Sequence, residues 1–163
     1  MGTIFTARSG APFTPLLSGN RSRSKANASG TDRPDLIAGR SPDSIILGGP
    51  DLYFDPKAFT VQPAGFLGTS GRNQLFGPGL MTWDFSLTKE TRMSFLGEGG
   101  RMEFRAEFFN LLNRANFNIP VNGRTVFTAN ETAASSTPLS TAGQIDRTVT
   151  PGRQVQFALK LLF

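Results

Sequence analysis

The chain has 163 residues, a length typical of one domain, since domains usually run to about 100–200 residues. Its 18 Gly and 11 Pro lie together well above the roughly 12 % of an average protein, which predicts many turns and loops. It contains no Cys and no His, which excludes disulfide frameworks, thiolate metal sites and the commonest catalytic base. We therefore expect no enzyme activity and no cofactor.

The formal net charge of +5 does not by itself indicate a nucleic-acid partner. The 17 cations are scattered among 12 acids, and the one basic cluster, Arg21, Arg23 and Lys25, lies between Ser and Asn residues. Short basic runs in polar segments are usually solvated. No stretch approaches the roughly 18 consecutive apolar residues of a membrane helix, but the strands of a membrane β-barrel only alternate and escape this test.

The first residues lack the basic and apolar regions of a secretory signal, and they also fit the middle of a strand. A cytoplasmic chain and a piece of a longer one are both compatible with this start. Residues 2–16 hold β-forming Thr, Ile and Phe residues, interrupted by Gly10 and Pro12, and predict a first strand.

Residues 80–95 show a period of two and predict a second strand. The polar positions are Thr82, Asp84, Ser86, Thr88, Glu90 and Arg92, and the opposite face holds Met81, Trp83, Phe85, Leu87, Met93 and Phe95. Lys89 is the one charged residue on the apolar side. If that side faces lipid, Lys89 should lie near the periplasmic boundary, because a Lys at the bilayer midplane costs about 2–4 kcal/mol.

Residues 101–113 predict a third strand, joined to the second through a glycine-rich turn at Leu96–Gly100. Arg101, Glu103, Arg105 and Glu107 alternate there with Met102, Phe104, Ala106 and Phe108. An amphipathic helix is the rival, because Phe104, Phe108, Leu111 and Leu112 also have helical spacing. The strict alternation favours the strand, and a helix across 103–112 would contradict it.

Residues 152–163 give the clearest alternation and predict the last strand. One face holds Val155, Phe157, Leu159, Leu161 and Phe163, and the other holds Gln154, Gln156, Ala158 and Lys160. Two long connections, 17–78 and 114–151, are rich in Ser, Thr, Asn, Gly and Pro. Long connections that alternate with short turns are typical of an outer-membrane barrel. A secreted β-sandwich for binding or adhesion is the alternative, and it would bury the same apolar face between two sheets.

Several segments resemble the carboxy-terminal end of TonB-dependent outer-membrane receptors, most closely the Oar-like group. They are SGAPFTP at 9–15, DRPDLIAG at 32–39, YFDPKAF at 53–59, GRNQLFGPGLMTWDFSLTK at 71–89, RMEFRAEFFNLLNRANF at 101–117 and the closing RQVQFALKLLF. The expected fold is therefore all-β: residues 1–163 form an antiparallel meander of about four long strands, the C-terminal fragment of a large transmembrane barrel with long extracellular loops. Four strands cannot close a barrel, for which about eight are needed.

The resemblance also implies a location and partners. A receptor of this family lies in the bacterial outer membrane and imports a large ligand. Its partners are membrane lipid, the barrel assembly machinery, the plug and remaining strands of the receptor, and TonB, which contacts a segment ahead of the barrel. The resemblance further implies that the last strand is the assembly signal, with Phe157, Leu159, Leu161 and Phe163 as its recognition residues.

Seven polar residues are expected to face the barrel lumen: Asp84, Ser86, Glu90, Arg92, Glu103, Arg105 and Glu107. We expect their Arg and Glu side chains to pair across adjacent strands. Glu103 and Glu107 lie roughly 13 Å apart along a strand, too far for a glycosidase pair. Five aspartates, at positions 32, 35, 43, 51 and 55, are a further candidate group for Ca²⁺, although their spacing matches no regular binding loop.

Overall fold

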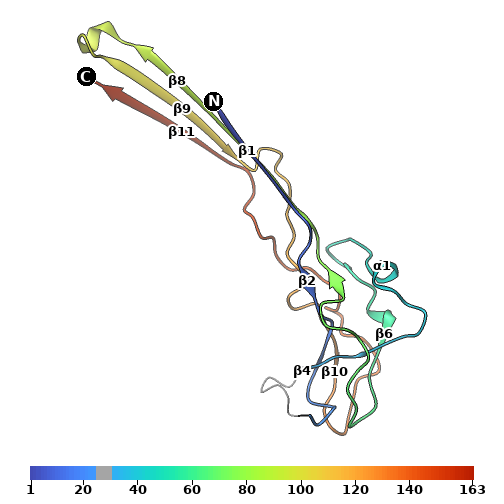
Figure 1. Cartoon of the computed structure of the whole chain (residues 1–163). Helices are drawn as coiled ribbons and strands as arrows, with labels where there is room; N and C mark the ends of the chain where they lie inside the picture. Colours follow the sequence, from blue (N-terminus) through green and yellow to red (C-terminus); the bar gives the residue numbers. More distant parts are fainter. Residues whose placement is uncertain (25–30) are drawn as a thin grey trace. The chain divides into compact units, whose positions relative to one another are not determined.

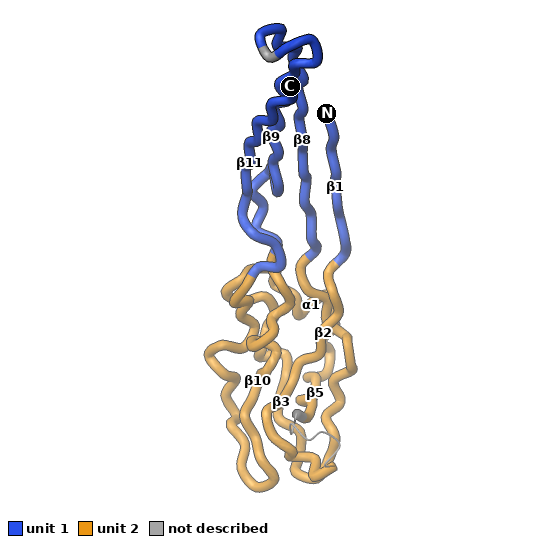
Figure 2. Tube along the Cα trace, turned by 90° about the vertical axis from the view of Figure 1, so that its left-hand side faces the viewer, with its two compact units in different colours: residues 1–9, 79–116, 148–163 blue, residues 10–78, 117–147 orange. Residues whose placement is uncertain are grey.

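The structure is a computed structural model that describes residues 1–24 and 31–163. The chain divides into two compact units, and Figure 2 colours them separately. Unit 1 consists of residues 1–9, 79–116 and 148–163, and unit 2 of residues 10–78 and 117–147. Among the helices of the described residues, none is long and apolar enough to cross a membrane.

Unit 1 is one antiparallel sheet of four strands in chain order (Figure 1). The strands are β1 (Gly2–Arg8), β8 (Leu80–Arg92), β9 (Arg101–Phe109) and β11 (Gln154–Leu162). Each strand pairs only with its neighbours in the order β1-β8-β9-β11. This confirms the all-β antiparallel meander, and β9 excludes the helix across 103–112.

The central hairpin is shorter than expected at both strands. β8 ends at Arg92, and a 3₁₀ turn, η2 (Ser94–Leu96), follows. The Met93 amide donates to the Gly100 carbonyl at 2.9 Å and closes the turn. Met93 and Phe95 are therefore not part of the apolar strand face, which corrects the expected range 80–95.

β9 likewise ends at Phe109 and not at 113. Asn110 and Asn113 have φ values of 50° and 51°, a left-handed conformation that cannot continue a strand and that Asn tolerates better than most residues. The backbone therefore turns out of the sheet directly after Phe109.

The expected first strand, 2–16, is divided into three. After β1 come β2 (Pro12–Phe13) and β3 (Leu16–Ser18), which belong to two other small sheets. The break lies at Gly10, where a Cβ would stand only 1.7 Å from the carbonyl oxygen of Gly77. This close backbone approach requires glycine. Pro12 has no amide donor, and it therefore limits the hydrogen bonding of a continuous strand here.

Unit 2 gathers most of both long connections into a set of short elements. They are β2, β3, β4 (Thr31–Asp32), β5 (Asp35–Leu36), α1 (Pro42–Ile45), η1 (Pro56–Ala58), β6 (Phe59–Thr60), β7 (Leu75–Phe76) and β10 (Thr125–Thr128). Three small sheets result, β10-β3-β4, β2-β7 and β5-β6. β10 and β3 are parallel, in contrast to every pair of unit 1.

A continuous core holds unit 2 together. Phe54 is fully buried, and its ring lies 5.8 Å from that of Phe13 and 6.1 Å from that of Phe59. Leu17, Ile45, Leu75, Val126 and Phe127 complete the core. Fully burying one such side chain contributes about 1.5–3 kcal/mol, so these connections form a packed unit where the composition had suggested only loops.

Candidate functional site

The strand register of unit 1 sorts the side chains onto two opposite faces. Phe85 lies opposite Thr3 on one side and Phe108 on the other, and Phe108 in turn lies opposite Val155. The period of two then assigns every other residue to the same face. The apolar face comprises Thr3, Phe5, Ala7, Met81, Trp83, Phe85, Leu87, Lys89, Thr91, Met102, Phe104, Ala106, Phe108, Val155, Phe157, Leu159 and Leu161.

Most of the large side chains of the apolar face are exposed. Phe157 is 67 % exposed, Trp83 38 % and Phe104 37 %, although the Phe104 and Phe157 rings stack at 6.0 Å. The described part of unit 1 forms a single sheet, so no second sheet of this unit covers the face. A sandwich would bury these residues between two sheets, and the exposed face favours the barrel.

Lys89 lies on the apolar face, as expected, and its neighbour across the strand pair is Phe104. It stands three residues before β8 ends at Arg92, close to the short turn. Its side chain is exposed and long enough to reach beyond the strand end. The position of Lys89 near the membrane boundary remains a prediction, and its place close to the end of β8 is compatible with it.

All seven predicted lumen residues share the opposite face of the sheet. Asp84, Ser86, Glu90 and Arg92 come from β8, and Glu103, Arg105 and Glu107 from β9. The structure thus brings them together on one surface, which also carries Gln154, Gln156 and Lys160 of β11. Whether this surface faces a lumen stays a prediction.

The ion pairs of the polar face differ in part from the expected pattern. Glu90 of β8 pairs across the strands, at 3.0 Å, with Arg101 of β9, a residue outside the seven. Arg105, however, pairs within its own strand, with Glu103 at 3.2 Å and with Glu107 at 4.0 Å. The register explains this, because Arg105 lies opposite Thr88 and Ala158 and has no acid directly across.

Three asparagines that the sequence analysis assigned no role stabilise the strand ends of unit 1. The amide of Asn110 donates to the carbonyls of Arg114 at 3.0 Å and Pro151 at 3.2 Å. Asn113 accepts from the Arg153 amide at 3.0 Å. The sequence signal for these three asparagines is the motif N-x-x-N-x-x-N, which begins directly after the last residue of β9.

Asn116 is the most buried of the three, at 1 % exposed. Its Oδ1 accepts from the Met81 amide at 2.9 Å, and its Nδ2 donates to Thr150 Oγ1 at 3.0 Å. The backbone carbonyl of Asn116 also accepts from the Val149 amide at 2.8 Å. One side chain therefore joins the start of β8 to the segment that leads into β11.

Three of the five candidate aspartates have separate partners in unit 2, while Asp43 lies in the first turn of α1 and Asp51 is exposed. Asp32 is buried and accepts from the Ser22 amide and hydroxyl at 2.7 and 2.8 Å. Asp35 accepts from the Thr69 amide, and Asp55 caps η1 and pairs with Arg40 at 3.2 Å. Within residues 1–24 and 31–163, no three acidic side chains gather in a way that would hold a metal ion.

The two described members of the basic cluster contact oxygen atoms of the protein itself. Arg21 donates to the backbone carbonyls of Gln62 and Asn130 at 2.8 and 3.2 Å. Arg23 lies 4.0 Å from Glu131. The third member, Lys25, lies outside the described residues. Both described arginines therefore already contact oxygen atoms of this protein.

The predicted assembly residues lie where the alternation placed them. Phe157, Leu159 and Leu161 stand on the apolar face of β11, and Phe163 follows the strand with 86 % of its surface exposed. β11 forms one outer edge of the described sheet, since it pairs only with β9. An exposed strand edge can add a further strand.

Comparison with known proteins gives a family match. The family model described as an outer membrane beta barrel domain matches residues 1–156, nearly the whole chain. No curated protein and no solved structure matches it. This match supports a membrane location for the sheet of unit 1, which has one apolar face and one polar face. The chain belongs to the outer membrane beta barrel domain family.

Proposed function

We propose that this chain is the C-terminal barrel segment of a bacterial TonB-dependent receptor, which binds a large ligand and imports it without covalent chemistry. The observation that carries the proposal is the sheet of unit 1, with an exposed apolar face and an opposite face of paired charges. A barrel strand shows this alternation when one face contacts lipid and the other a polar interior.

Burial in lipid accounts for the apolar face. Removing a side chain such as Phe157 from water contributes about 1.5–3 kcal/mol, and the face repeats this gain along β8, β9 and β11. The polar face, with its Arg and Glu pairs, would be costly in hydrocarbon and suits a lumen filled by water or a plug.

The two unpaired edges of the described sheet are an argument for a larger barrel. In the described sheet, β1 pairs only with β8, and β11 only with β9. Unpaired amide and carbonyl groups cost several kcal/mol each in hydrocarbon, so membrane barrels close and leave no edge. Further strands of the same receptor would pair with β1 and β11. The ordered segments that resemble TonB-dependent receptors are the reason for proposing this class of barrel.

The test uses the complete gene product that contains this chain, expressed in a bacterium with an outer membrane. Detergent extracts of the outer membrane are passed over the immobilised periplasmic domain of TonB. We expect the protein in the outer-membrane fraction and its retention on the TonB domain. The matched control deletes only the segment that precedes the plug, which should abolish retention and leave membrane location unchanged.

Two results would contradict the proposal in different ways. A protein that is soluble without detergent would favour a secreted sandwich. A protein that resides in the outer membrane but is not retained by TonB would be a barrel of another class.

A further inference from the structure

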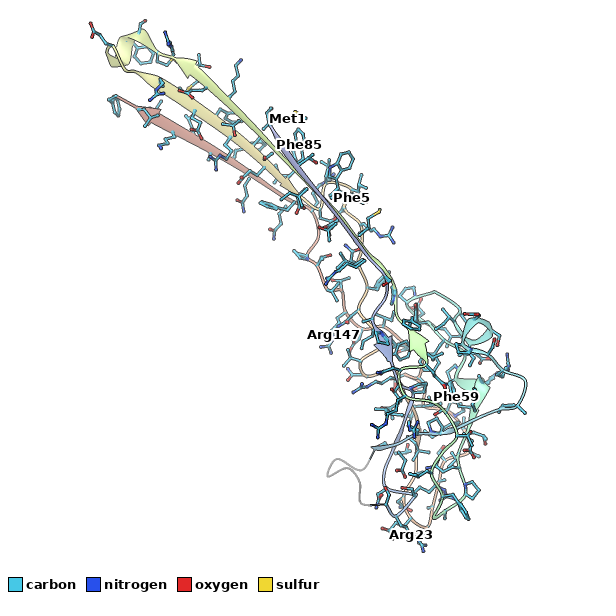
Figure 3. The ribbon with its side chains drawn as sticks, in the orientation of Figure 1. Met1, Phe5, Arg23, Phe59, Phe85 and Arg147 are labelled. Carbon is cyan, nitrogen blue, oxygen red and sulfur yellow. The ribbon has the colours of Figure 1, made fainter. Side chains whose placement is uncertain are left out.

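Unit 1 contains a hollow of about 310 Å³ at β1, β8 and β9. Six of its nine lining residues belong to the polar face, Gly2, Ile4, Asp84, Ser86, Glu107 and Phe109, and the other three, Thr3, Phe85 and Phe108, alternate with them along the same strands. In Figure 3 the labels Met1 and Phe85 mark this part of the sheet. The volume is at the lower end of ligand sites, about 300–1,000 Å³, and suits one or two amino-acid side chains.

Small residues create the hollow. Gly2 lies opposite Ser86, and Ser86 lies opposite Glu107, so two of these three positions carry no side chain or only a hydroxymethyl group. A Cβ on Gly2 would stand 2.9 Å from Ser86 Oγ. The floor is therefore backbone and a single hydroxyl.

Two apolar residues, Ile4 and Phe109, interrupt the polar face beside the hollow and contribute to its lining. Ile4 lies opposite Asp84 in the next row and is 65 % exposed. Phe109, the last residue of β9, is 38 % exposed. Neither belongs to the apolar face of the sheet, so lipid contact does not explain them.

The hollow also carries two carboxylates. Asp84 Oδ1 accepts from the Asn110 amide at 2.9 Å, which fixes the side chain beside Phe109. Glu107 is a diagonal neighbour, and such pairs stand about 7–8 Å apart in a sheet. The cation nearest to Glu107 among the ion pairs of the described residues is Arg105, at the loose distance of 4.0 Å.

We propose that this hollow binds a basic peptide, with one Arg or Lys side chain between Asp84 and Glu107 and an adjacent apolar side chain against Ile4 and Phe109. A guanidinium suits the site because it donates to carboxylates in a fixed planar geometry and stacks on an aromatic ring such as Phe109. The inference deepens the proposed function, on which it rests, by naming the chemical class that the receptor recognises.

The test measures binding of the dipeptide Phe-Arg amide to the detergent-purified protein by titration calorimetry, with Phe-Glu amide as the charge-reversed probe. We expect saturable binding of Phe-Arg amide alone. The double variant Asp84→Asn/Glu107→Gln should weaken it at least tenfold, because both charges are lost while the introduced carboxamide at position 84 still offers an oxygen to the Asn110 backbone amide. The variant Ser86→Leu, which fills the floor, should weaken it without any change of charge.

The matched control is Glu98→Gln/Asp51→Asn, which changes net charge equally outside the hollow and should bind as the parent does. Folding of each variant is checked by heat-dependent migration of the barrel in gel electrophoresis. Equal binding of both dipeptides, or equal weakening by the control, would overturn the inference. A photo-crosslinker at Ile4 that captures the protein's own chain would also overturn it, because the site would then be filled internally. A correctly folded barrel that binds TonB and not Phe-Arg amide refutes the inference alone and leaves the proposed function intact.

Discussion

The indole Nε1 of Trp83 donates to Thr3 Oγ1 at 2.6 Å, across the β1–β8 pair on the apolar face. Thr3 Oγ1 donates onward to the Asp84 carbonyl at 3.2 Å. Trp usually lies at a membrane interface because its N–H needs a polar partner. Here the neighbouring strand supplies that partner, so Trp83 can lie in hydrocarbon with its donor satisfied.

This pair predicts a non-additive mutant cycle. Thr3→Val leaves the Trp83 donor unpaired and should lower the free energy of unfolding by about 1–3 kcal/mol. Trp83→Phe in the Thr3→Val background should restore part of that loss, because replacing both partners by apolar groups is nearly neutral. Urea unfolding in detergent micelles measures each variant. Strictly additive changes would show that the two groups do not interact.

Asn116→Ala should destabilise unit 1, because it leaves the Met81 amide and the Thr150 hydroxyl without their partner. A loss of about 1–3 kcal/mol is expected when the part-buried Met81 amide loses its acceptor. The control is Asn118→Ala, since Asn118 Oδ1 accepts from the adjacent Ile119 amide, and the hydrogen bond from the Asn118 backbone amide to the Arg147 carbonyl does not need the side chain. Equal unfolding midpoints for the two variants would refute the role of Asn116 as the link between β8 and the start of β11.

Unit 2 should lose some stability in acid through Asp146. The Arg147 guanidinium, which hydrogen-bonds the carboxylate, lowers the pKa of Asp146, and the Asn122 amide acts in the same direction. A carboxyl whose pKa is lower in the folded state stabilises the fold above its unfolded pKa, about 3.9. The contribution disappears as the pH falls through the lower folded value.

Asp146→Asn should therefore flatten the stability–pH curve below about pH 4, with a small amplitude because the group is at the surface. Unfolding monitored by fluorescence between neutral and acid pH measures the effect. Asp51→Asn, at another exposed position, provides the comparison. An unchanged acid limb in Asp146→Asn would contradict the assignment.

Deletion of Phe163 separates a recognition role from a structural one. Its removal costs at most about 1.5–3 kcal/mol of burial, which is modest for a large barrel. If the last strand is an assembly signal, folded barrel in outer membranes should fall sharply while refolding into micelles stays normal. Equal and small losses in both assays would leave Phe163 with the structural role alone.

The long strands were predictable because a period of two extends through them. β8, β9 and β11 follow this alternation closely, and the sheet that it implies also places the seven polar residues on one face. The sequence does not reveal their ends as clearly, because β9 ends through the left-handed backbone of Asn110 and β8 through a 3₁₀ turn. Both depend on local hydrogen bonds and not on a repeating pattern.

Unit 2 was not predictable in the same way. Its core unites residues far apart in the chain, such as Phe13, Phe54 and Phe127, within segments rich in Ser, Gly and Pro. Strands of two to four residues are too short to show a period. The hollow beside Gly2 was missed for a related reason, since it depends on the register that sets Gly2 against Ser86.

The most direct test of the membrane-facing sheet is a spin-label scan along β11. The chain has no Cys, so single variants from Gln154→Cys to Leu162→Cys can be labelled in the protein in outer-membrane vesicles. We predict high access of lipid-soluble oxygen at positions 155, 157, 159 and 161, and access of a water-soluble nickel reagent at 154, 156, 158 and 160. Protection of the odd positions from both reagents, or no period of two, would contradict the account.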